Sequence, residues 1–177
     1  QDNGSNLIRN GNAHHIRGGD GMYNLISPDD SMTLYSSTQY GGFSRSRNGG
    51  NGFKGIFKPW RGNGPWVTPM AINPQNTKTV YALFNSNLIV SYNEGDTTSI
   101  LGYPPSNPRS YALLEMCAGD TMHFYTGDRN NLRHSGDYGQ TWQSIMPANV
   151  SAAPTDICVH PTKPGHIWVT FSGITAD

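Results

Sequence analysis

The octapeptide Ser135–Trp142 (SGDYGQTW) constrains the fold of this chain more than any other stretch. An Asp side chain accepts hydrogen bonds from nearby backbone N–H groups, and glycine adopts positive φ without steric cost. Asp137 and Gly139 therefore predict a tight polar turn. A short alternating run precedes the turn and the large apolar Trp142 follows it, so the whole unit predicts a β-hairpin.

Similar turns occur at two earlier places, residues 46–53 and 91–98. The leading serines are 45 and 44 residues apart, and a constant spacing of this size indicates a solenoid or a propeller. Both earlier turns have Asn in place of Asp, and the second ends in Thr instead of an aromatic residue. The residues that make up the three copies are Ser46, Asn48, Gly50, Phe53, Ser91, Asn93, Gly95, Thr97, Ser135, Asp137, Gly139, Thr141 and Trp142.

The repeated pattern resembles the Asp box, or bacterial-neuraminidase repeat, of sialidases, sortilins and two-propeller xyloglucanases. This resemblance covers most of the chain and implies an all-β propeller of four-stranded antiparallel blades, in which the repeated residues are structural. It is specific for the fold and says little about function.

The order of strands and turns predicts three complete blades and part of a fourth. The expected division is 1–20 as the end of a preceding blade with a connecting loop, 21–57 as the first blade, 58–101 as a linker and the second, 102–146 as a linker and the third, and 147–177 as half of the fourth. A propeller closes with about four to eight blades. The expected partners are therefore the remaining blades, supplied by a longer chain or by another protein.

Composition excludes several classes of function. Only 14% of the residues are charged and the formal net charge is zero, so no basic face for nucleic acid is expected. The sequence contains no run of eighteen apolar residues, so no membrane span is predicted. Low charge with abundant Asn and Gly favours a secreted or cell-surface protein. No cofactor or metal is expected, because His14 and His15 have no further ligand at a suitable spacing and are predicted to lie in a solvated loop.

The two cysteines, Cys117 and Cys158, fall at similar positions in consecutive repeats. We expect two buried free thiols, with a disulfide between them as the alternative.

The loops between the second and third strands of each blade gather on the face opposite the repeated turns, where function is expected. Counting back from the leading serines aligns Asp128 with Gln39. The stretch around Gln39 is similar to a xyloglucanase motif in which an acid stands there and is catalytic. Glutamine cannot transfer a proton as a carboxylate does, so no catalytic residue is predicted within this segment. Asp128 and Asp20 are the weak candidates for catalysis.

The residues predicted to bind a ligand are Trp60, Asp128 and Arg129. Trp60 offers a ring on which a sugar can stack, and the alternative is that Trp60 and Trp66 cover the joint between two blades. The leading hypothesis is a non-catalytic module that binds a glycan or a protein. One alternative is a glycoside hydrolase of the xyloglucanase or sialidase kind, with acids partly outside the segment. Another is an architectural propeller within an adhesin or a secreted assembly.

Overall fold

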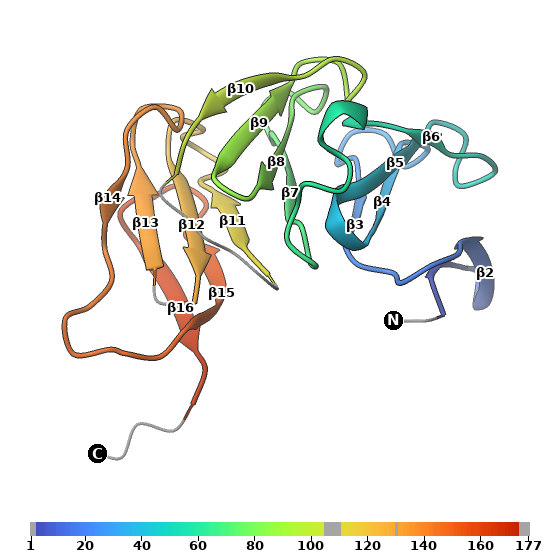
Figure 1. Cartoon of the computed structure of the whole chain (residues 1–177). Helices are drawn as coiled ribbons and strands as arrows, with labels where there is room; N and C mark the ends of the chain where they lie inside the picture. Colours follow the sequence, from blue (N-terminus) through green and yellow to red (C-terminus); the bar gives the residue numbers. More distant parts are fainter. Residues whose placement is uncertain (1–2, 105–110, 130, 174–177) are drawn as a thin grey trace.

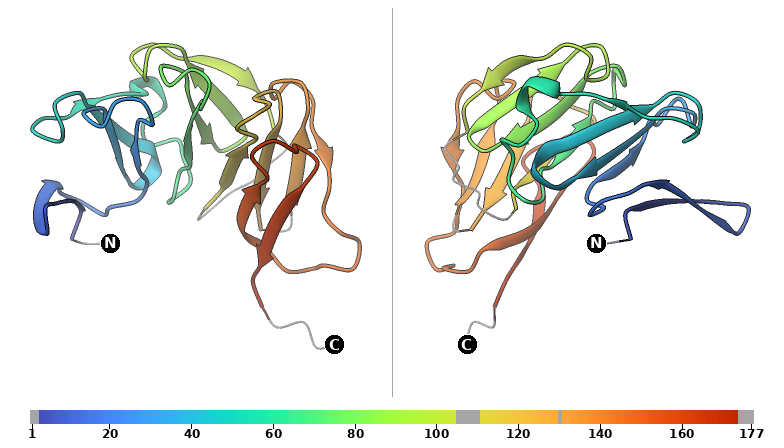
Figure 2. Two further views of the ribbon diagram at one scale, coloured as in Figure 1. Left: turned by 180° about the vertical axis from the view of Figure 1, so that it is seen from behind. Right: turned by 45° about the vertical axis from the view of Figure 1, so that its right-hand side comes forward.

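The computed structural model describes residues 3–104, 111–129 and 131–173, and it is built almost entirely of antiparallel β-sheets. Three sheets have four strands each, and one two-stranded sheet lies at each end of the chain. In Figures 1 and 2 the sheets follow one another along an arc in the order of the sequence. This arrangement is that of propeller blades.

Each of the three four-stranded sheets is one blade, with its strands paired in chain order. The first blade has β3 (Asn24–Ile26), β4 (Leu34–Thr38), β5 (Gly42–Ser46) and β6 (Lys54–Gly55). The second has β7 (Met70–Ile72), β8 (Val80–Phe84), β9 (Asn87–Ser91) and β10 (Ser99–Gly102). The third has β11 (Leu113–Met116), β12 (Phe124–Asp128), β13 (Asn131–Ser135) and β14 (Gln143–Ser144). The last sheet pairs β15 (Pro154–Val159) with β16 (Ile167–Phe171).

The N-terminal segment differs from the prediction that His14 and His15 lie in a solvated loop. It forms a hairpin of β1 (Ser5–Arg9) and β2 (Asn12–Arg17), joined at Asn10–Gly11, where both residues have positive φ. An Asn-Gly pair favours a two-residue hairpin turn, so the sequence carries a local signal for this hairpin. His14 and His15 therefore lie on a strand, where both are exposed.

The core lies between neighbouring blades, not within one. Successive side chains of a strand point to opposite faces, so each central strand serves two joints. In β8, Val80, Ala82 and Phe84 pack with the first blade, while Tyr81 and Leu83 pack with the third. A third cluster joins the third blade to β15 and β16. Each blade thus depends on a neighbour to bury its faces.

The connecting loops lie on two faces of the arc, and hydrogen bonds between loops identify one of them. The loop after the third strand of each blade donates a backbone N–H to the loop after the first strand, as Tyr138 does to the carbonyl of Met122. Equivalent bonds join Gly49 to Met32 and Glu94 to Lys78. The loops after the second strands lie at the other ends of the strands, as the register of β12 with β13 requires.

The outer sheet leaves apolar surface uncovered. Trp168 on β16 is exposed and its ring stacks on His160. Cys117 is buried, whereas Cys158 is exposed, so the expectation of two buried thiols is wrong for Cys158. Ile157 faces the joint with the third blade, and strand alternation turns Cys158 to the opposite face. Both thiols are free.

Candidate functional site

The three serine-led turns, residues 46–53, 91–98 and 135–142, share one hydrogen-bond pattern, and we call them the Ser–Asx turns. In each, the serine hydroxyl donates to the Asn or Asp side chain and accepts the N–H of the glycine four residues on. Asp137 also accepts the backbone N–H and the hydroxyl of Thr141, at 2.8 and 2.5 Å. These bonds hold the pKa of Asp137 at about 2. Its carboxylate is therefore ionised and hydrogen-bonded within the turn.

The opposite face carries a cavity of about 470 Å³ around Gln39. It is formed where β2, the loop between β4 and β5, and the linker after β6 meet. We call it the Gln39 pocket, and its lining residues are Arg17, Gly18, Gly19, Thr38, Gln39, Tyr40, Arg61 and Gly62. Gly19 has a φ of +85°, and a Cβ there would lie 3.2 Å from the Thr38 side chain. Glycine thus lets the two loops approach closely.

Tyr40 lies at the centre of the short 3₁₀ turn η1 (Gln39–Gly41) with a φ of 57°, which is uncommon for a residue other than glycine. Two backbone bonds hold it there, from Tyr40 N–H to the carbonyl of Trp66 and from Gly62 N–H to the carbonyl of Tyr40. The Trp66 ring meets the Tyr40 ring edge to face at 5.1 Å. The Tyr40 side chain is nevertheless 44% exposed, so it presents an aromatic surface at the pocket.

Two guanidinium groups give the Gln39 pocket a positive potential. Arg17 donates to the carbonyl of Gly42 at 3.0 Å. Burial, and then the neighbouring Arg61, lowers the pKa of Arg17. A guanidinium stays charged even so, and the two cations therefore repel each other across the pocket. An anion between them would relieve that repulsion.

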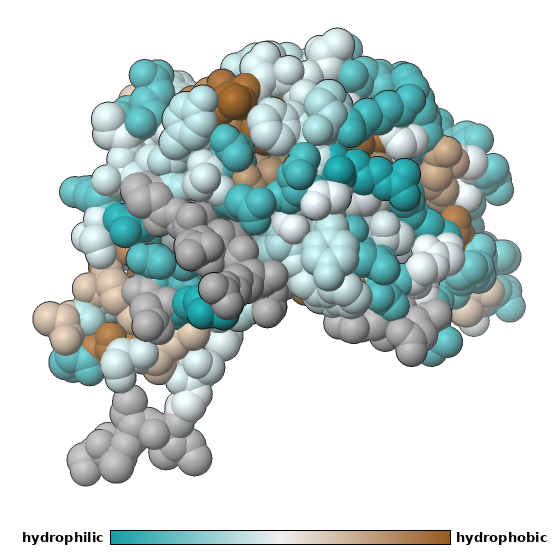
Figure 3. Space-filling model, viewed as in Figure 1, coloured by the Kyte–Doolittle hydropathy of each residue, from teal (hydrophilic) through white to brown (hydrophobic). Residues whose placement is uncertain are grey.

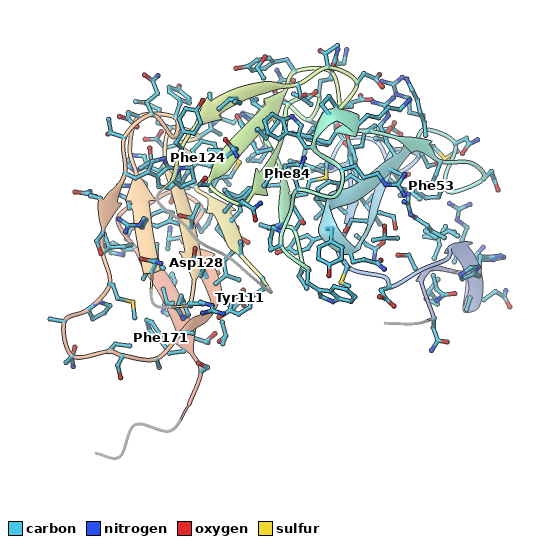
Figure 4. The ribbon with its side chains drawn as sticks, in the orientation of Figure 1. Phe53, Phe84, Tyr111, Phe124, Asp128 and Phe171 are labelled. Carbon is cyan, nitrogen blue, oxygen red and sulfur yellow. The ribbon has the colours of Figure 1, made fainter. Side chains whose placement is uncertain are left out.

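Asp128 is the last residue of β12 and lies beside Tyr111 (Figure 4). The strand register aligns it with Thr38 and Phe84, not with Gln39, so the alignment counted from the serines is wrong by one residue. The loop after β4 is one residue longer than the loop after β12, which displaces the count. The Asp128 side chain is 1% exposed and accepts a hydrogen bond from Asn131. It does not lie in the Gln39 pocket.

The remaining predicted residues lie at separate places. Trp60, in the 3₁₀ turn η2 (Lys58–Trp60), packs against Phe84, and its ring N–H donates to Thr98. It is half-buried, in the position that the blade-joint alternative predicts. Arg129 is exposed on the loop after β12 and has a φ of 32°. Asp20 is partly buried in the connection between β2 and β3.

Sequence reasoning missed an acidic pair on the inner strands. Glu115 of β11 lines a groove of about 300 Å³ that also contacts β3 and β7. Desolvation of its carboxyl group, and then the charge of Asp156 on β15, raises the pKa of Glu115 to about 7. Tyr23 lines the same groove, and its pKa is raised by burial and by both acids. Only the meeting of first strands from different blades brings these residues together, so no local motif could reveal them.

Among the described residues, no group of three or more His, Cys, Asp or Glu side chains is placed to hold a metal ion. Within the same ranges, no helix has the length and apolar character to cross a membrane.

Solved β-propellers share this architecture. The GH74 xyloglucanase from Xanthomonas campestris superposes with a TM-score of 0.67 at 18% identity, over 88% of this chain and 28% of that one. A nutrient-binding protein from Bacteroides thetaiotaomicron gives a TM-score of 0.59 at 8% identity, over 86% and 36%. YCF48 bound to a D1 peptide gives 0.54 at 10% identity, over 81% and 44%.

These similarities establish a β-propeller fold. The chain spans less than half the length of each of these propellers. No protein-family model matches the sequence. No curated protein matches it either.

Proposed function

We propose that the chain is part of an extracellular propeller that binds an acidic glycan without cleaving it. The observation that carries the proposal is the Gln39 pocket, where Arg17 and Arg61 flank an amide and an exposed aromatic ring. The guanidinium groups supply two cations and the Tyr40 ring supplies an apolar surface. A uronic acid or a sulfated sugar offers the matching anion and an apolar ring face.

Gln39 supports binding over hydrolysis. Its amide donates and accepts hydrogen bonds, but it has no titratable proton near neutral pH. Glycoside cleavage normally requires two carboxyl groups across the bond, and the lining of this pocket includes neither Asp nor Glu. The pocket can therefore hold a saccharide but cannot supply an acid and a base.

The proposal retains the other predicted features of the chain. Trp60, Asp128 and Arg129 remain proposed contacts for a longer glycan or a protein partner, with Asp128 requiring a movement of its loop because it is buried. The Ser–Asx turns are proposed to be Asp boxes with a structural role. The exposed Trp168 supports a further blade, from a longer chain or a partner, packing on β16.

Calorimetric titration with a neutral and an acidic oligosaccharide of equal length tests this function. We expect the oligogalacturonide to bind and cellotetraose to bind this pocket at least tenfold more weakly, with affinity falling as salt rises because the contacts are ionic. Arg17→Ala and Arg61→Ala should each abolish the preference. Lys163→Ala, an exposed cation on the turn between β15 and β16, is the matched control. An oligogalacturonide affinity that neither Arg17→Ala nor Arg61→Ala lowers would refute an anion pocket.

Glycoside hydrolysis is the second candidate, favoured by the raised pKa of Glu115 beside Asp156. A carboxyl group with a pKa near 7 can act as a general acid. Product analysis after incubation with oligosaccharides separates the two functions. Turnover that disappears in Glu115→Gln would establish hydrolysis and reject the binding module.

A further inference from the structure

A second cavity, of about 410 Å³, opens between the second and third blades on the face of the Ser–Asx turns. It is the opposite face from the Gln39 pocket. Its walls come from the loop between β7 and β8, from strand β10, and from the second and third Ser–Asx turns. We call it the Tyr92–Tyr138 cavity, and its lining residues are Asn73, Asn76, Thr79, Tyr81, Tyr92, Leu101, Tyr138 and Gln140.

Two exposed tyrosines flank this cavity and a third lies within it. Tyr92 is 66% exposed and Tyr138 is 45% exposed, although aromatic side chains are usually covered. Tyr138 has a φ of 60°, and the hydrogen bond from its N–H to the carbonyl of Met122 holds it in the turn. Tyr81 is buried, and its hydroxyl accepts a hydrogen bond from Asn73 at 3.3 Å.

The cavity is a property of the side chains, since an ion pair bridges the equivalent positions in the joint between the first and second blades. Strand register and turn position make Tyr92 equivalent to Arg47, and Tyr138 equivalent to Glu94. In the first joint these two positions form an ion pair, with Arg47 Nε 2.7 Å from a Glu94 carboxylate oxygen. In the second joint the same positions carry two aromatic rings that leave a space between the turns.

We propose that the Tyr92–Tyr138 cavity binds one or two rings of a neutral saccharide. All eight lining residues are uncharged, so neither an anion nor a cation would find a countercharge there. Two aromatic rings offer surfaces on which the apolar face of a sugar packs. A volume in the range of ligand pockets, with a few polar groups, fits a small ligand.

The polar groups of the cavity match sugar hydroxyls. Among the described residues, the side-chain amides of Asn76 and Gln140 form no hydrogen bond, so both can donate and accept. Burial raises the pKa of Tyr81, with the nearby Tyr92 and Tyr138 adding to the effect. Its phenol therefore stays protonated at neutral pH and can donate to a ligand oxygen. Such groups fix the orientation of a sugar that stacking alone would leave free.

The test is calorimetric titration with the neutral tetrasaccharides cellotetraose, maltotetraose and mannotetraose. At least one should bind, with affinity insensitive to salt because no ionic contact is involved. Tyr92→Ala and Tyr138→Ala should each weaken binding about tenfold, the effect expected from loss of one stacked ring. Tyr92→Phe keeps the ring and should bind within about threefold of the unaltered protein. Absence of binding by all three sugars would overturn the proposal.

Three further variants keep the result interpretable. Tyr103→Ala removes an exposed tyrosine outside the cavity and should leave the affinity unchanged. The triple change Tyr92→Arg, Tyr138→Glu and Gln140→Asp installs three charges of the first joint, those of Arg47, Glu94 and Asp96. It should eliminate binding while circular dichroism still shows the folded sheet. Arg17→Ala should leave neutral-sugar binding intact. If Arg17→Ala removes it and Tyr92→Ala does not, the sugar occupies the Gln39 pocket and this proposal fails.

Discussion

The joint between the first and second blades and the joint between the second and third share a backbone plan but differ in chemistry. In the first, Arg45 lies 3.3 Å from Glu94 and 3.1 Å from Asp96, with Arg47 and Lys54 at the rim. In the second, the position of Arg45 is Val90, and an uncharged cavity opens above it. Figure 3 shows mostly hydrophilic surface with small, separate apolar patches, so neither joint is marked by a broad apolar surface in that view.

The difference teaches that the turns and the joints carry separate information. The Ser and Asx side chains fix the backbone of each turn through local bonds. Side chains that do not take part in those bonds are free to make a joint either an ion-paired contact or an open cavity. Fold and binding capacity can therefore vary independently in one blade.

The largest effect on stability is expected from Arg45→Val, which places in the first joint the residue type that Val90 provides in the second. Arg45 is buried, and its guanidinium also donates to the carbonyls of Asn93 and Glu94. Arg45→Val leaves Glu94 paired only with Arg47, leaves Asp96 paired with Arg47 and Lys54, and removes the donor to two carbonyls. We therefore expect a loss of about 2 kcal/mol in unfolding free energy, measured by urea denaturation. Adding Arg47→Tyr, Glu94→Tyr and Asp96→Gln should recover most of the loss. A neutral single variant would show that the ion pairs do not stabilise the joint.

The next effect distinguishes the three turns by pH. Asp137 has a folded pKa of about 2, below its ordinary 3.8, because Thr141 and Ser135 bond its carboxylate. A lowered folded pKa gives stability that is complete above about 4 and is lost as the pH falls toward 2. The first two turns have Asn at this position and cannot titrate. Thermal melts of Asp137→Asn should therefore fall less steeply between pH 4 and pH 2 than those of the unaltered protein, and parallel curves would contradict this.

A weaker effect of opposite sign is expected at Glu115. Its folded pKa of about 7 lies above the ordinary 4.5, so the folded state binds more protons in that window. The contribution of Glu115 to stability should therefore be greatest below about pH 4.5 and decline as the pH rises through 7. Because Glu115 is exposed, solvent screens its charge and the decline should be modest. Glu115→Gln should flatten the melting temperature between pH 5 and 7, and an unchanged slope would assign it to other groups.

Sequence alone predicted the blades because their signals are local. Ser135, Asp137 and Gly139 lie within five residues of one another, and their turn chemistry needs no tertiary contact. The cavities could not be predicted in the same way. The Gln39 pocket joins residues from β2, from η1 and from the linker after β6, and Glu115 meets Asp156 only when separate blades pack. Asp128 illustrates the limit, since one additional loop residue shifted its alignment.

The smallest effect compares Tyr92 with Arg47 at the same turn position. Tyr92 is largely exposed and borders a cavity, so Tyr92→Ala should change unfolding free energy by no more than about 0.5 kcal/mol. Arg47 is also exposed but pairs with Glu94, and Arg47→Ala should cost about 0.5–1 kcal/mol, an effect that salt reduces. Urea denaturation at low and high salt measures both. If Tyr92→Ala destabilises the protein as much as Arg47→Ala does, the Tyr92 ring stabilises the joint and is not reserved for ligand binding.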